Sequence, residues 1–205
     1  MKRISNVKPI LMDEVKKIVD EAYDQLINDY FIPFFKSLDG QYKVGVIKSK
    51  APKIKVVKID KIEDLNSIPS NSPGFYVILT DYMSGYSEKN LCNLKLEGYS
   101  DVKAIYRGEA YNVRLRLMSH LYKDTYDFNK KEDSISTRKR ADNYTVCLKL
   151  EDQVTSGINL DKEKKLSKAN WFVAYHGMRG TDNFIRKAVE KAFDTVYGKP
   201  LCSRD

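Results

Sequence analysis

The chain has 205 residues, which is enough for one domain with an addition and enough to bury most of a compact core. Its 36 Lys and Arg residues against 28 Asp and Glu give a formal net charge of +8, and its 42% hydrophobic residues exclude a wholly disordered chain. No apolar stretch approaches the roughly 18–20 residues that cross a bilayer, and the first residues lack the apolar core of a signal peptide. The three cysteines form no C-x-x-C pair, so neither a disulfide framework nor a zinc ribbon is expected. We therefore expect a basic protein of the cytoplasm with no membrane partner.

Two features mark the N-terminal part of the chain. An amphipathic helix is predicted over Pro9–Tyr30, because apolar residues recur there at spacings of three and four, and we expect it to stop before Pro33. This helix either mediates dimerisation or covers the sheet. The segment Tyr42–Lys61 follows and predicts two short strands around Ala51-Pro52.

Basic side chains are concentrated in two segments. Tyr42–Lys61 carries seven Lys against one Asp, and its lysines, Lys53 and Lys55 among them, either contact a phosphate backbone or keep an edge strand from pairing. A second group, Arg138, Lys139 and Arg140, lies in the charged segment Lys123–Asn143, which we expect to be a surface loop or insertion. That group is either simply exposed or contacts DNA.

The remaining elements follow a Ser-, Asn- and Pro-rich join at 66–73. In chain order the patterns predict strands at Gly74–Thr80 and Val102–Arg107, a helix at Asn112–Tyr122, strands at Tyr144–Leu150 and Trp171–Tyr175, and a helix at Thr181–Tyr197. Thr181 is expected to cap the last helix, and Gly198 to end it. The prediction is an α+β fold, with a small, mainly antiparallel sheet flanked by helices. Residues 1–70 are expected to form a helix-and-strand addition to a main domain at 71–205.

A small group of residues, spread over the predicted strands and helices, is expected to carry the catalytic chemistry. One predicted strand begins Gly74-Phe75-Tyr76, and the next ends Tyr106-Arg107-Gly108. The ungapped run from Tyr106 to His120, YRGEAYNVRLRLMSH, places an Arg and a His on the following helix, and Glu190 lies on the last helix. These segments resemble the GIY-YIG nuclease superfamily. Arg107 stands where that family usually has Ile or Val.

The resemblance implies a role for each of five residues. Tyr76 is the general base, Tyr106 orients water or phosphate, Arg116 is the catalytic arginine, His120 is an auxiliary or rival base, and Glu190 holds a metal ion. A planar guanidinium suits this chemistry because it binds two phosphate oxygens at once. One carboxylate is enough for Mg²⁺ when water and substrate phosphate complete its shell, so Mg²⁺ is the expected cofactor and Mn²⁺ the alternative. Each residue also has a structural interpretation, as strand packing for the tyrosines and as ion pairs for Arg116 and Glu190.

The predicted helix at Asn112–Tyr122 carries polar residues four apart. Asn112, Arg116 and His120 are expected to form one stripe that faces a cleft, with Asn112 contacting nucleic acid. The apolar residues expected on the opposite side are Val113, Leu117 and Leu121.

The expected function is that of a metal-dependent DNA endonuclease, a hydrolase that cleaves phosphodiester bonds by direct attack of water. The insertions and the basic N-terminal part look most like the type II restriction enzyme branch, which implies a homodimer acting on double-stranded DNA. The alternatives are a homing, repair or phage nuclease of the same superfamily, an RNA-directed nuclease, and a catalytically silent nucleic-acid-binding module.

Overall fold

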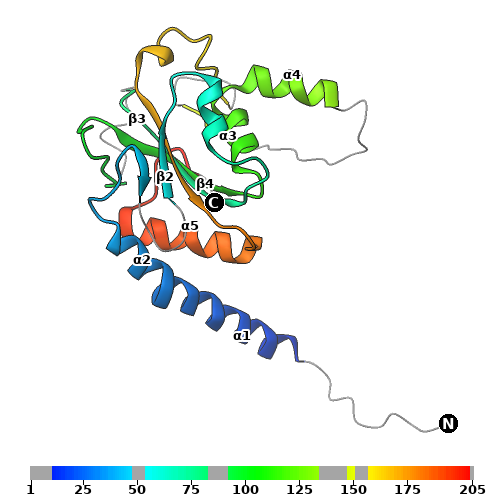
Figure 1. The fold of residues 1–205 in the computed structure, drawn as a ribbon. Helices are drawn as coiled ribbons and strands as arrows, with labels where there is room; N and C mark the ends of the chain where they lie inside the picture. The colour runs from blue at the N-terminus through cyan, green and yellow to red at the C-terminus, as the bar shows by residue number, and fades with distance from the viewer. Residues whose placement is uncertain (1–10, 48–53, 83–91, 134–146, 151–156, 204–205) are drawn as a thin grey trace, which may run out of the picture.

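A five-stranded antiparallel sheet forms the centre of the molecule in a computed structural model that describes residues 11–47, 54–82, 92–133, 147–150 and 157–203 (Figure 1). The strand order is β1-β2-β5-β3-β4. The strands are β1 (Gly45–Ile47), β2 (Ile54–Lys58), β3 (Gly74–Thr80), β4 (Lys103–Ala110) and β5 (Trp171–Gly177). The fold class expected from the sequence, α+β with a small antiparallel sheet flanked by helices, is confirmed.

Helices cover both faces of the sheet, so the interior strand β3, which lies between β5 and β4, is buried along its whole length. Successive side chains of a strand point to opposite faces. Phe75 and Val77 accordingly pack in one apolar layer with α5 (Asn183–Tyr197) and α2 (Ile32–Ser37). Tyr76 and Ile78 pack in the other layer, with α3 (Val113–Leu121) and the 3₁₀ turn η2 (Ile62–Ser67). A functional residue of β3 therefore belongs to either the α5 layer or the α3 layer.

The N-terminal helix is longer than the sequence predicts. The helix α1 (Met12–Gln25) continues through a π-helical turn, η1 (Leu26–Phe31), into α2. The prediction that it stops before Pro33 is wrong. Pro33 lies in the first turn of α2, immediately after the π-helical turn has shifted the backbone register, and a proline in a first helical turn lacks an N–H that would have no helical partner anyway.

Two predictions for the middle of the chain are also wrong. Lys123–Asp133 forms the helix α4 where a loop was expected. This helix is held by contacts that an apolar pattern does not reveal: Tyr126 is buried, and Asp124 accepts from Lys162 Nζ at 2.7 Å. The described part of the strand predicted at Tyr144–Leu150, residues 147–150, contains no strand.

The two predicted parts of the chain share one sheet, because β2 pairs with β5 along five residue pairs. The chain end covers part of the opposite edge, where Cys202 donates its N–H to Ile105 and Arg107 donates its N–H to Ser203 Oγ at 2.8 Å. The three cysteines are free thiols. Within the described residues, no helix has the length and apolar character needed to cross a bilayer.

The start of α5 provides a test of local stability. Asp182, rather than the expected Thr181, caps this helix, since its Oδ1 accepts the N–H of Ile185 at 3.0 Å. Asp182→Ala should lower the free energy of unfolding by about 1 kcal/mol in urea denaturation, whereas Asp182→Asn should keep most of it, because Asn also caps well. Equal losses in the two variants would contradict this role.

Candidate active site

The pairing of β3 with β4 brings the two motif tyrosines together. Tyr76 lies opposite Gly108, and Tyr106 lies opposite Ile78 two pairs away, so both tyrosines point into the α3 layer. Their rings are stacked, with centroids 6.3 Å apart and an interplanar angle of 22°. Both side chains are buried, at 0% and 4% exposure. The two tyrosines therefore lie side by side in a packed interior.

Gly108 makes room for the Tyr76 hydroxyl. A Cβ atom at residue 108 would lie 2.6 Å from Tyr76 Oη and 2.9 Å from Cζ, well inside van der Waals contact. Gly74, at the other motif position, meets the backbone of His176 on β5 in the same way. Both glycines therefore serve close approach rather than an unusual backbone angle.

The helix α3 supplies the next two side chains. Asn112 caps this helix by accepting the N–H of Leu115 through Oδ1 at 3.1 Å, and its amide donates to Asn71 at 3.1 Å. Asn112 is thus engaged at the helix start, and its contact with nucleic acid stays a prediction. Arg116 and His120 point into the buried layer instead.

The predicted division of α3 into a polar cleft side and an opposite apolar side is wrong. Neighbouring residues of an α-helix lie about 100° apart, so residues 112, 116 and 120 adjoin residues 113, 117 and 121 rather than oppose them. Both sets contribute to one buried face, on which His120, Val113 and Leu117 are all 0% exposed. The polar groups of α3 are therefore enclosed by apolar neighbours.

His120 is held from both ring nitrogens. Burial keeps its pKa well below the ordinary value of 6.5, so the ring is neutral at physiological pH. Nδ1 accepts the N–H of Leu148 at 2.7 Å, and a nitrogen that accepts carries no proton. The ring proton is then on Nε2, which donates to Tyr76 Oη at 2.8 Å. His120 consequently has no unoccupied basic nitrogen.

Arg116 completes the cluster. Burial raises the pKa of both phenols, well above 10 for Tyr76, while the charge of Arg116 and its hydrogen bonds act in the opposite direction on each. Arg116 Nη1 also lies 4.0 Å from Cys147 Sγ, and Ser119 Oγ donates to the Arg116 carbonyl at 2.7 Å. One buried guanidinium thus interacts with both tyrosines.

Glu190 lies in the other layer. Its Oε1 accepts from Arg107 Nη1 at 3.2 Å, and its side chain is 16% exposed. Arg107 is adjacent to Tyr106 on β4 and points to the opposite face, toward α5. The carboxylate is therefore held on the α5 side of the sheet. Its charge still raises the pKa of both Tyr76 and Tyr106, which places the carboxylate within electrostatic reach of them.

Arg107 stands where the family that this chain resembles usually has Ile or Val, and the packing of β4 gives a structural reason for the difference. Alternate β4 residues face α5, which presents charged residues four apart, and the facing charges are opposite in sign. Arg107 binds Asp194 through Nη2 and Nε at 2.6 and 3.0 Å, in addition to Glu190. Glu109 accepts from Arg186 Nε at 2.6 Å. Arg186 therefore pairs with Glu109, and Glu190 pairs with Arg107.

The carboxylate of Glu190 meets part of what Mg²⁺ requires. Burial, partly offset by Arg107, raises its pKa from 4.5 to about 7, and nearby Glu109 and Asp194 act in the same direction as burial. A divalent cation would favour the ionised form here, and a partly exposed carboxylate oxygen is a ligand of the right type. In the part of the chain described, no group of three or more His, Cys, Asp or Glu residues is arranged to hold a metal. Glu190 therefore fits Mg²⁺ only if water and substrate supply the other ligands.

The predicted basic contacts lie away from this cluster or outside the described residues. Lys55 on β2 donates to the Ser67 carbonyl at 3.2 Å, and β5 separates its strand from β3. Lys53, Arg138, Lys139 and Arg140 lie outside the described residues. Their contact with DNA stays a prediction.

No protein-family model, curated protein or solved structure matches this chain. The site is therefore interpreted from its own geometry and from the motif residues.

Two groups of residues escaped the sequence interpretation. The segment at Cys147 and Leu148 contacts Arg116 and His120, and nothing in its sequence signals this. The ion pairs of β4 with α5 did leave a signal, since residues two apart on a strand share a face, as do residues four apart on a helix. That signal becomes visible only once the two elements are known to pack together.

The close approach of Tyr76 to Gly108 can be tested by double substitution. Gly108→Ala should lower the free energy of unfolding by about 1–3 kcal/mol, because the methyl group collides with the Tyr76 phenol. In a Tyr76→Phe background the loss should shrink, since the nearest colliding atom is gone, without vanishing, since Cζ remains. Gly98→Ala, at a positive φ of 82° and with no atom within 4 Å of its Cβ, is the control and should cost the same in both backgrounds. An equal loss of unfolding free energy from Gly108→Ala in the two backgrounds would show that the methyl group does not collide with the Tyr76 hydroxyl.

The raised pKa of Glu190 predicts a pH dependence of stability. Because the folded state holds this proton up to about pH 7 and the unfolded state only to about 4.5, the stability gained is complete below 4.5 and is lost as the pH rises through 7. Relative to Glu190→Gln, the wild type should lose up to about 3 kcal/mol over that range, measured by urea denaturation at each pH. Parallel curves for the two proteins would show that this carboxylate titrates normally.

Proposed function

We propose that the protein is a metal-dependent DNA endonuclease of the GIY-YIG type. One observation carries the proposal: Tyr76, Tyr106, Arg116 and His120 come from three separate elements and converge in one hydrogen-bonded cluster. A buried arginine among two phenols and a neutral histidine is suited to an anion such as a phosphodiester. The ungapped Tyr106–His120 motif supplies the reaction class.

Arg116 has the role of binding the phosphate. Its guanidinium donates to two non-bridging oxygens of the scissile group and stabilises the additional negative charge that develops as water attacks phosphorus. Tyr106, beside it, orients the same group through its hydroxyl. The enclosed setting strengthens these interactions because little water screens them.

Tyr76 is the group that takes the proton of the attacking water. As the water oxygen bonds to phosphorus, its proton moves to Tyr76 Oη, and the bond to the departing 3′ oxygen breaks. Tyr76 must first be ionised, and both Arg116 and the N–H of His120 Nε2 favour the phenolate oxygen. His120 itself is a donor in this arrangement, which favours Tyr76 as the base.

Glu190 is the residue that would hold the metal ion. A bound Mg²⁺, or Mn²⁺ in its place, would supply positive charge that offsets the charge of the departing oxygen. Arg107 positions the Glu190 carboxylate on the α5 side of the sheet. Substrate reaches Tyr76 only when neighbouring side chains move, because the hydroxyl is buried.

Within this class we favour a type II restriction enzyme, which acts on double-stranded DNA as a homodimer, over a homing, repair or phage nuclease. The basic charge supports this choice, as does the presence of one such cluster among the residues that the structure describes, since cutting two strands requires two centres. The second candidate is a catalytically silent nucleic-acid-binding module. The observation that favours it is the burial of both phenols together with the engagement of Glu190 by Arg107.

Plasmid cleavage distinguishes these functions. Wild-type protein with Mg²⁺ should cut DNA, Arg116→Ala and Tyr76→Phe should each slow cleavage by about 10²–10⁴-fold, and EDTA should abolish it. Glu190→Ala should keep DNA affinity while losing cleavage. Lys165→Ala, an exposed change near η3 (Leu166–Lys168), is the control and should cut normally.

The products assign the type of enzyme. Discrete fragments indicate a restriction enzyme, random nicks a repair-type enzyme, and retention of DNA without breaks the binding module. Cleavage by Tyr76→Phe at the wild-type rate would contradict the mechanism.

A further inference from the structure

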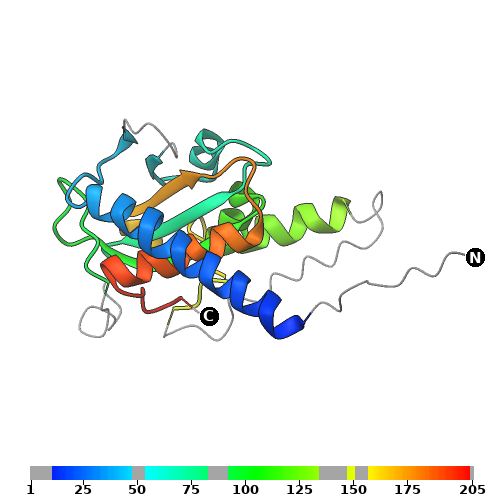
Figure 2. The same ribbon diagram turned by 90° about the horizontal axis from the view of Figure 1, so that it is seen from below.

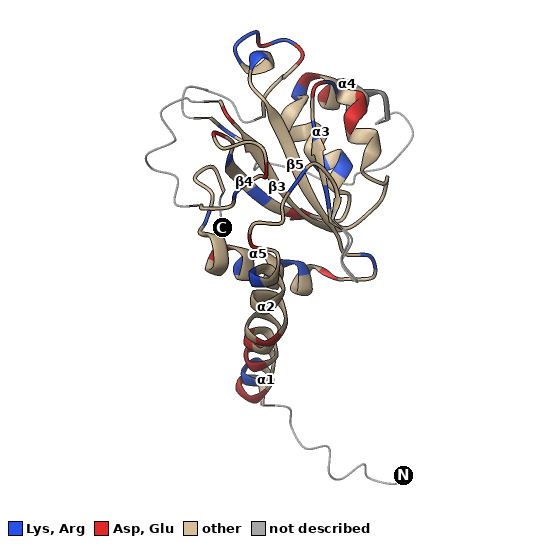
Figure 3. Ribbon diagram, turned by 60° about the vertical axis from the view of Figure 1, so that its left-hand side comes forward, with Lys and Arg blue, Asp and Glu red and all other residues tan. Residues whose placement is uncertain are grey.

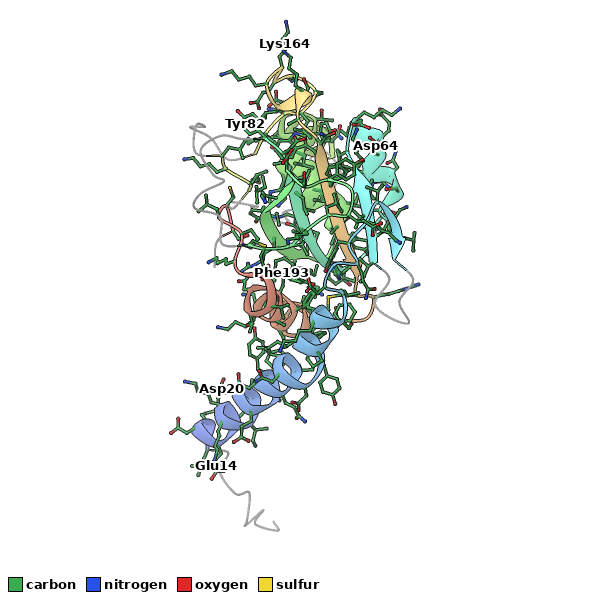
Figure 4. The ribbon with its side chains drawn as sticks, turned by 90° about the vertical axis from the view of Figure 1, so that its left-hand side faces the viewer. Glu14, Asp20, Asp64, Tyr82, Lys164 and Phe193 are labelled. Carbon is green, nitrogen blue, oxygen red and sulfur yellow. The ribbon has the colours of Figure 1, made fainter. Side chains whose placement is uncertain are left out.

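The helix α5 holds Glu190 and Asp194 against the same face of β4. The two residues are four apart, so their side chains project from one side of the helix. Phe193, which is fully buried, lies between α5 and the sheet and packs on Phe75 of β3 with ring centroids 5.2 Å apart (Figure 4). Seen from below, α5 crosses the sheet beside the N-terminal helices (Figure 2). Core packing therefore sets the position of both carboxylates relative to β4.

Arg107 binds these two carboxylates unequally. Asp194 accepts from Nη2 at 2.6 Å and from Nε at 3.0 Å, so both of its oxygens bind one edge of the guanidinium. Glu190 accepts a single hydrogen bond, from Nη1 to Oε1, at 3.2 Å. No residue that the structure describes donates a hydrogen bond to the second oxygen of Glu190, Oε2. Arg107 is thus bound mainly by Asp194, and Glu190 is its weaker partner.

The shape of the guanidinium explains why Asp194 matters to Glu190. A planar guanidinium binds a carboxylate most strongly through two parallel N–H groups, either those of Nε and Nη2 or those of Nη1 and Nη2. Nη2 belongs to both pairs. Because Asp194 engages Nη2 at 2.6 Å, Arg107 approaches Glu190 through Nη1. With Nη2 released, the guanidinium would be free to bind both oxygens of Glu190 and to neutralise this carboxylate.

Two arginines and three carboxylates meet between β4 and α5. Arg186 Nε binds Glu109 at 2.6 Å, and Arg107 Nη2 binds Asp194 at 2.6 Å. Each arginine therefore has its shortest ion pair with a carboxylate other than Glu190. Figure 3 shows basic and acidic residues on α5, and Glu190 is the carboxylate of this group with the longest contact, at 3.2 Å. Glu190 is accordingly the carboxylate best placed to exchange its partner for another cation.

We propose that Asp194 is a positioning residue that restrains Arg107, so that Oε2 of Glu190 stays available to a divalent cation. This inference rests on the proposed function, in which Glu190 holds Mg²⁺ or Mn²⁺. Arg107 and the metal ion carry charge of the same sign, so they compete for the Glu190 carboxylate. Asp194 lessens this competition because it holds the guanidinium by two hydrogen bonds and leaves one oxygen of Glu190 to the metal ion.

The restraint on Arg107 can be tested without metal or DNA. In a crystal structure of Asp194→Ala, Arg107 should contact both oxygens of Glu190 through Nη1 and Nη2. Asp194→Asn keeps the side-chain volume and an acceptor for Nε but cannot accept from Nη2, so it should show the same contact if Asp194→Ala does not fold. Asp182→Asn removes a negative charge from the same helix and should leave Arg107 in its wild-type position. A guanidinium that still makes one contact with Glu190 in the position-194 variants would overturn the proposal.

Metal binding tests the consequence for Glu190. Mn²⁺ bound by the protein alone can be measured from the loss of the free-ion signal in electron paramagnetic resonance, with Glu190→Gln as the background. Asp194→Ala should raise the Mn²⁺ dissociation constant of the Glu190 site by about 10-fold or more. Adding Arg107→Ile should restore the affinity, because the competing guanidinium is gone, whereas a purely structural role of Asp194 predicts no rescue. Asp182→Asn should bind Mn²⁺ as the wild type does.

The outcomes separate this inference from the proposed function. Unchanged Mn²⁺ affinity in Asp194→Ala, or no rescue by Arg107→Ile, would overturn the role of Asp194 and leave the nuclease proposal standing. Wild-type protein that binds no more Mn²⁺ than Glu190→Gln would instead overturn Glu190 as the metal ligand, and this inference with it. Weakened binding that Arg107→Ile restores would support both.

Discussion

The buried cluster of Tyr76, Tyr106, Arg116 and His120 depends on a single close approach, that of the Tyr76 phenol to the backbone of Gly108. The register of β3 against β4 places these residues opposite each other, and the missing side chain at 108 lets the hydroxyl lie over the strand. In this position the hydroxyl accepts a hydrogen bond from the Nε2–H of His120 on α3. A methyl group at 108 would move the hydroxyl away from this donor, so the spacing of the motif reflects packing as much as chemistry.

The sheet separates the proposed site into two layers that β4 connects. Tyr106 faces Arg116 and His120, while Arg107, its neighbour, faces Glu190 and Asp194. A carboxylate across the sheet from the groups that we propose to bind phosphate can act at the same bond only near the edge of β4. Arg107 is then a positioning residue, which is a physical reason for charge where an apolar side chain is usual in the family that this chain resembles.

The sequence predicted the elements that combine strong periodicity with clear boundaries. β3 matches its predicted residues, and α3 and α5 form where expected, since their apolar spacing is a local property, although Asp182 rather than Thr181 caps α5. The loop expected at Lys123–Asp133 is the helix α4, because ion pairs and one buried tyrosine stabilise it instead of an apolar face. The convergence of Tyr76, Tyr106, Arg116 and His120 followed from the motif. The engagement of Glu190 by Arg107 did not, because it depends on the packing of α5 against β4.

The most direct test of the account is a crystal structure of Glu190→Gln bound to duplex DNA with Mg²⁺. The account predicts one phosphate with two oxygens on the Arg116 guanidinium and its phosphorus facing the Tyr76 hydroxyl, with the substituted side chain at position 190 on the side of the departing oxygen. A duplex bound elsewhere, with Arg116 still enclosed by the two phenols, would contradict the account.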